Sequence, residues 1–101
     1  MSLIRLTLAC PQALAEQMAE FLLECEELGG GFTAWTGSGH GADFSAASLR
    51  EQVRGRVQVS LLTAVLPAQS LAPLLASLRA RFRAPHVRYW TEAVLEFGDL
   101  T

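Results

Sequence analysis

Hydrophobic and polar residues alternate along residues 3–9, which predicts a strand with one strongly buried face. Apolar residues then recur at helical spacing, opposite a stripe of glutamates, which predicts an amphipathic helix. The same order returns in the second half of the chain, and two further strand patterns accompany it. The predicted strands are residues 3–9, 32–36, 57–66 and 87–97, and the predicted helices are residues 14–28 and 71–82.

The two halves of the chain are also similar in sequence. Residues 6–11 read LTLACP and residues 62–67 read LTAVLP, and each segment leads into a leucine-rich helix. Each proline follows a strand at a place where a helix can begin, because its fixed φ suits a first turn. The order strand, helix, strand therefore occurs twice. We predict an α+β fold, a ferredoxin-like βαββαβ sandwich with an antiparallel sheet and two helices on one face.

The two faces of the predicted sheet differ in what covers them. We expect the helices to cover the rows Ile4-Leu6-Leu8 and Val57-Val59-Leu61. The opposite face then carries Leu3, Thr7, Leu62 and Ala64. Side chains of the second and fourth strands can alternate between the faces in two ways, and one of these adds Trp35, Trp90 and Val94 to the same face. An apolar and aromatic surface of this extent is unfavourable in water. We therefore expect self-association, as a trimer with the sheets facing inward or as a dimer with the sheets face to face.

Length, charge and cysteine content narrow the class of protein. The chain of 101 residues makes one domain, residues 1–101. The formal net charge of −2 provides no positive field, so we expect no nucleic-acid partner. No apolar run has the pattern of a signal peptide or a membrane span, so we expect a cytoplasmic protein whose only membrane role is through a partner. Cys10 and Cys25 have the pattern of reduced, buried thiols.

Residues 37–56 separate the second and third predicted strands, where this fold needs only a hairpin. The excess length indicates a loop that binds something. Its first residues, Gly37, Ser38 and Gly39, can present backbone N–H groups to an anion or a nucleotide. The alternative is that these glycines serve only the conformation of the loop.

The same segment carries two more groups of candidate ligands. His40 and Asp43, joined by His86 from a neighbouring subunit, can hold a divalent metal, the alternative being a solvated histidine without a partner. The basic residues of the segment are Arg50, Arg54 and Arg56. These arginines can hold a phosphate or carboxylate ligand, or they can form ion pairs with Asp43 and Glu51.

Four further segments complete the pattern. They are residues 36–41 (TGSGHG), 51–56 (EQVRGR), 88–91 (RYWT) and 95–98 (LEFG). With the two βαβ halves, they resemble the PII-like superfamily over the whole chain, closest to an uncharacterised bacterial branch shorter than true PII proteins. The resemblance implies a trimeric signalling protein whose T-loop, here residues 37–56, contacts a protein partner and closes over a ligand between subunits. In nitrogen-regulatory PII proteins that ligand is an adenine nucleotide.

Two other functions stay open. The CutA ion-tolerance proteins have a related trimeric fold, so a divalent-metal-binding protein using His40, Asp43 and His86 is the first alternative. The second is a small ferredoxin-like enzyme, which needs a pocket between helices and sheet and a polar residue in the buried pattern. The predicted buried rows contain no such residue, and no nucleophile stands with a base, so we expect no catalysis.

Overall fold

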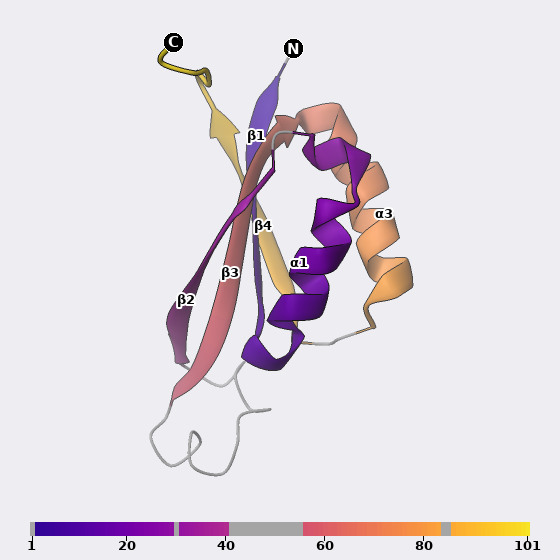
Figure 1. The fold of residues 1–101 in the computed structure, drawn as a ribbon, viewed down its shortest axis with the longest axis vertical. Helices are drawn as coiled ribbons and strands as arrows, with labels where there is room; N and C mark the ends of the chain where they lie inside the picture. Colours follow the sequence, from indigo (N-terminus) through magenta and orange to yellow (C-terminus); the bar gives the residue numbers. More distant parts are fainter. Residues whose placement is uncertain (1, 30, 41–55, 84–85) are drawn as a thin grey trace.

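Four antiparallel strands form one sheet in the order β2-β3-β1-β4, and two helices cover one face of it (Figure 1). The computed structural model describes residues 2–29, 31–40, 56–83 and 86–101. The strands are β1 Leu3–Pro11, β2 Thr33–His40, β3 Arg56–Pro67 and β4 Arg88–Val94, and the helices are α1 Ala15–Leu23 and α3 Leu71–Arg81. This arrangement confirms the predicted ferredoxin-like α+β fold.

Pro11 and Pro67 end the two inner strands in the same way. Both have extended backbone, with φ −55° and ψ 142° at Pro11 and φ −61° and ψ 139° at Pro67. Each is followed by a 3-10 turn, Gln12–Leu14 or Ala68–Ser70, that leads directly into a helix. A proline has no N–H for a further ladder hydrogen bond, so the strand ends there, while its φ suits the entry to a helix.

The core lies between the sheet and the two helices. Helix α1 contributes Met18 and Leu22, and α3 contributes Leu74 and Leu78, all at positions that the helical spacing predicted. The other buried residues of the core are Leu6, Leu8, Cys10, Leu28, Leu62, Ala64 and Leu66. Each helix therefore gives only one stripe to the core and leaves its other faces to solvent.

The two sequence repeats meet at the centre of the sheet. Thr7 and Thr63 occupy the same place in the repeats LTLACP and LTAVLP, and they are also direct register partners across β1 and β3. An approximate twofold axis therefore passes between them and relates the two halves of the chain. As a consequence, Leu62 occupies the place of Leu6 and faces the same layer.

The row of β3 that faces the helices differs from the predicted one. Leu62 and Ala64 pair with Leu8 and Leu6 and are buried in the core, where Leu62 is only 2% exposed. Their predicted place on the opposite face is wrong, and the row Val57-Val59-Leu61 lies on that face instead. Both rows of β3 are apolar, so the alternation does not distinguish them, and pairing with β1 decides which row is buried.

Candidate functional site

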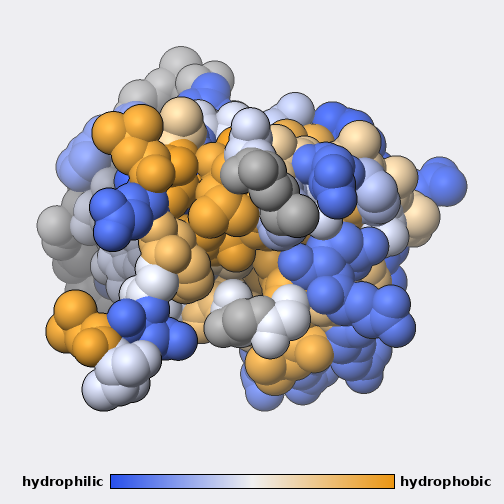
Figure 2. All heavy atoms as spheres, turned by 90° about the horizontal axis from the view of Figure 1, so that it is seen from above, coloured by the Kyte–Doolittle hydropathy of each residue, from blue (hydrophilic) through white to orange (hydrophobic). Residues whose placement is uncertain are grey.

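The sheet face that the helices leave uncovered, named here the open face, is mostly apolar. Its apolar residues are Leu3, Ala9, Trp35, Val57, Val59, Leu61, Val65, Trp90 and Val94. Trp35 on β2 and Trp90 on β4 stand on the two edge strands, and they are 46% and 43% exposed. Seen from the end that holds both termini, hydrophilic residues gather on the helix side and hydrophobic residues toward the sheet and the centre (Figure 2). The expectation of an apolar second face is confirmed.

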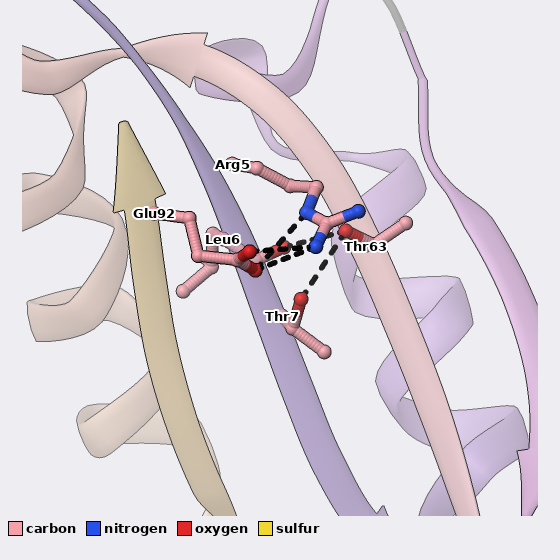
Figure 3. Close-up of polar contacts among 5 residues, drawn as sticks. All are labelled: Arg5, Leu6, Thr7, Thr63 and Glu92. Atoms are coloured by element: carbon pink, nitrogen blue, oxygen red, sulfur yellow. Dashed lines mark hydrogen bonds and ion pairs between the residues drawn. The ribbon is translucent and has the colours of Figure 1, made fainter. Parts of the chain in front are cut away.

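An ion pair between Arg5 and Glu92 lies on the open face. Arg5 on β1 and Glu92 on β4 are register partners, and the guanidinium donates three hydrogen bonds of 2.7–3.1 Å to the carboxylate (Figure 3). The two side chains are 47% and 45% exposed. A half-exposed pair contributes about 0–1 kcal/mol to stability in water. Its bidentate geometry nevertheless pairs each charge with a fixed partner on the same face.

A short chain of hydroxyl groups lies beside this ion pair. The Thr63 hydroxyl donates to the carbonyl of Leu6 at 3.2 Å, which leaves the Thr63 oxygen to accept from Thr7 at 3.3 Å (Figure 3). Among the described residues, every buried side-chain nitrogen or oxygen has a hydrogen-bond partner. The open face is therefore a surface that another molecule can cover without leaving its central polar groups unpaired.

The glycine tract begins as part of a strand. Residues 37–40 continue β2 and pair with β3, so their predicted place in a loop is wrong. The alternate spacing puts Gly37 and Gly39 on the open face. A Cβ on Gly37 would lie 3.1 Å from the Leu61 side chain, so a larger residue there would press against Leu61. Gly37 thus leaves room for the Leu61 side chain on the open face, a packing role that the sequence pattern did not reveal.

The predicted ligand residues are only partly brought together. Ser38 and His40 are exposed on the other row of β2, and His40 stands opposite Arg56 across the β2–β3 pair. His86 is exposed in a turn before β4. The predicted positions that lie outside the described residues are Asp43, Arg50 and Arg54. In the part of the chain that is described, no three His, Cys, Asp or Glu side chains gather into a potential metal site.

A pocket of about 240 Å³ opens on the helix side of the sheet. It is lined by Leu8, Met18, Leu75, Leu78, Arg79, Phe82, Val87 and Tyr89. Tyr89 on β4 pairs with Leu8 on β1 and shares its face of the sheet. Arg79 comes from the last turn of α3. The pocket therefore combines an apolar wall with one guanidinium and one phenol.

The rows expected to be buried, Ile4-Leu6-Leu8 and Val57-Val59-Leu61, contain no polar residue, but the helix-side face as observed does. Tyr89 lines the pocket, and Ser60 on the same face is buried. The signal for Tyr89 was present in the sequence: residues alternate along a strand, so a Trp90 on the open face places Tyr89 toward the helices. The sequence contained no such signal for Arg79, because a long arginine side chain in the last turn of a helix can extend in several directions. The expected absence of catalysis stays a prediction.

Both cysteines are free thiols, as predicted from their spacing. Cys10 is fully buried, and this burial raises the pKa of its thiol above the ordinary value of 9.0. Burial raises the pKa of Cys25 as well, and the negative charges of Glu27 and Glu24 add to the effect. The Cys25 thiol donates to the carbonyl of Phe21 at 3.3 Å. Raised pKa values keep both sulfurs protonated and weakly nucleophilic near neutral pH.

The sheet, its order and its two helices define a ferredoxin-like α+β protein. A similar solved structure is the crystal structure of a DUF3240 family protein from Shewanella baltica OS155. The similarity covers 100% of this chain and 99% of that one, with a TM-score of 0.80 and 21% sequence identity, and at this identity it concerns the fold. The sequence model of the family described as "Protein of unknown function (DUF3240)" matches residues 1–101, so the chain belongs to the DUF3240 family.

No curated protein matches the sequence. Among the described helices, none has the length and hydrophobicity needed to cross a membrane.

Proposed function

We propose that this protein is a PII-like regulatory protein that forms a homotrimer through its open faces. In this proposal a small ligand binds between subunits, and residues 37–56 contact a protein partner. The observation that carries the proposal is the open face, an apolar surface whose central polar side chains are paired with one another. The candidate ligands are an adenine nucleotide and, in the CutA-like alternative, a divalent metal.

The size of the open face supports an assembly of this kind. Four strands about 4.8 Å apart, each with roughly nine residues at 3.3 Å, give a face of about 19 by 30 Å, on the order of 600 Å². A stable protein interface buries about 800 Å² on each partner. The face thus supplies most of the area that one subunit needs.

The C-terminal segment supplies further apolar surface. Leu95, Phe97 and Leu100 follow β4 and are 100%, 64% and 106% exposed, so they do not join the core of their own subunit. Both termini lie at the same end of the sheet (Figure 1). Exposed leucine and phenylalanine side chains beside an uncovered apolar face favour a second copy as the partner for both.

The β2–β3 pair supports the role given to residues 37–56. β1 ends at Pro11, opposite Val59, whereas β2 and β3 continue past it. Their last three pairs join residues 38–40 to residues 56–58, with no third strand from the described residues beside them, and we name this part the two-stranded ribbon. The ribbon leads directly into residues 41–55, so it is suited to presenting that segment to a partner.

Light scattering combined with gel filtration tests the assembly. We expect a trimer at micromolar concentration, and Leu61→Glu is expected to give a folded monomer because it places a charge on the open face. The matched control is Leu23→Glu on α1, since Leu23 is 73% exposed on the helix side and the change is expected to leave the trimer intact. A wild-type monomer would overturn the proposal.

A thermal-shift panel of adenine nucleotides, bicarbonate and divalent metals tests the ligand. A ligand at a hundred times its dissociation constant stabilises the native state by about 2.7 kcal/mol. Loss of a metal-induced shift in His40→Ala would support the metal-binding alternative, and loss of a nucleotide-induced shift in Arg54→Ala would support the nucleotide. Unchanged shifts in both variants would contradict a ligand site in residues 37–56.

A further inference from the structure

The pocket between α3 and β4 is a second candidate site, separate from the open face. It lies within one subunit, on the helix side of the sheet. It is partly open to solvent and has a volume of about 240 Å³. An apolar cavity of roughly 150 Å³ already binds benzene. The space therefore suits a single aromatic ring or a short branched chain.

The polar residues that line the pocket indicate which polar group such a ligand carries. Arg79 and Tyr89 are its two polar lining residues. In the described part of the chain, neither the Arg79 guanidinium nor the Tyr89 hydroxyl has a hydrogen-bond or ion-pair partner. The neighbouring Arg81 differs, because its guanidinium lies 4.8 Å over the Phe82 ring. A guanidinium and a phenol that line one pocket can both donate to a carboxylate, which accepts several hydrogen bonds at once.

We propose that this pocket binds a small carboxylic acid with an aromatic or branched aliphatic body. Arg79 and Tyr89 hold the carboxylate, and the body packs against Met18, Leu75 and Leu78. Because all these residues belong to one subunit, the site does not depend on the trimer. A failure of the assembly proposal and a failure of this one are therefore separate results.

Methyl NMR of methionine gives a direct readout of this pocket. The chain has two methionines, Met1 and Met18, and Met18 lines the pocket. In protein labelled at the methionine methyl carbons, we expect phenylacetate to shift the Met18 resonance and to leave that of Met1 in place. The uncharged analogue phenylacetamide is expected to bind at least about tenfold more weakly, because it loses the charge-assisted hydrogen bonds to Arg79. No Met18 shift with either probe would overturn the proposal.

Variants separate the carboxylate contact from nonspecific binding. Arg79→Gln is expected to weaken phenylacetate binding by about tenfold or more and to change phenylacetamide binding little. Arg83→Gln is the control, since Arg83 follows the end of α3 and is not among the lining residues. Leu75→Phe is expected to fill the pocket and abolish binding of both probes. Equal affinities for acid and amide, or equal effects of Arg79→Gln and Arg83→Gln, would contradict the carboxylate assignment.

Discussion

Leu61 and Leu62 are neighbours in sequence with opposite surroundings, and glutamate at each position tests which face of β3 is buried. Leu62 is 2% exposed beneath the helices, whereas Leu61 lies partly exposed on the open face. We expect Leu62→Glu to abolish folding and Leu61→Glu to leave the fold intact. Far-ultraviolet circular dichroism and urea unfolding measure both outcomes.

The expected magnitudes come from the two environments. At position 62 the substitution forfeits the burial of a leucine, about 2–3 kcal/mol, and leaves an unpaired charge in the core, which costs about 3–5 kcal/mol more. A domain of this size has a total stability of about 5–15 kcal/mol, so most of it is lost. At position 61 the carboxylate stays hydrated in the separated subunit, and the expected cost is about 1 kcal/mol.

The reverse result would refute the reasoning. If Leu61→Glu unfolded the chain and Leu62→Glu did not, the originally predicted row would be the buried one. If Leu61→Glu stayed folded and still formed the wild-type assembly, the open face would not be the interface. The alanine variants at the same two positions give the same comparison with milder changes, expected at about 2–5 kcal/mol for the buried leucine and less for its neighbour.

Four further results are expected. A double-mutant cycle between Arg5 and Glu92 should give a coupling energy above about 1.5 kcal/mol in the assembled protein, because burial makes such a pair strong. In the monomeric variant Leu61→Glu the coupling energy should be below about 1 kcal/mol. A small coupling energy in both proteins would indicate that the open face stays in solvent. Iodoacetamide should modify the partly exposed Cys25 before the fully buried Cys10, as read by mass spectrometry. Both thiol pKa values are raised above 9.0 in the folded state, so the unfolded chain loses these protons first. The contribution of the two thiols to the free energy of unfolding should therefore be constant below about pH 9 and fall above it. A double alanine variant whose free energy of unfolding falls equally above about pH 9 would contradict this origin. Removal of residues 95–101 should leave the urea midpoint of dilute protein unchanged. The dissociation constant of the assembly should rise about tenfold or more. An unchanged dissociation constant would exclude residues 95–101 from the interface.

Much of the fold follows from two patterns in the sequence. The change from strand to helical spacing, repeated in the two halves, was sufficient for the order of elements and for the class. The prolines after residues 6–10 and 62–66 indicated where the two inner strands end to within two residues, because their chemistry is local. Helix residues such as Met18 and Leu74 were identified as core by spacing alone, since only one face of each helix is apolar.

The error at β3 has a physical cause and a remedy in the same sequence. Both rows of this strand are apolar, one because it meets the helices and one because it belongs to the open face, so a period of two carries no information about side. The sequence repeat between residues 6–11 and 62–67 does indicate which row of β3 faces the helices. Leu62 corresponds to Leu6, and a strand related by the twofold axis must present equivalent residues to the same layer.

The candidate sites were harder to predict than the fold. Gly37 and Gly39 suggested a loop because glycine weakens strands, but their alternate spacing also fits one face of a strand that must leave room for Leu61. The pocket joins Leu8, Arg79 and Tyr89, which are distant in sequence. No local pattern reports a space that forms only when α3 packs over β1 and β4.

The two-stranded ribbon has a mechanical consequence. Among the described residues, no third strand lies beside the ribbon, and an isolated pair of strands is only marginally stable, so we expect residues 38–40 and 56–58 to bend more easily than the rest of the sheet. We therefore expect any bending to centre where β1 ends, at Pro11, between the four-stranded part of the sheet and the ribbon. A partner bound to the ribbon is then expected to change its angle at low energetic cost, and amide exchange along the ribbon is expected to be faster than in the rest of β2 and β3.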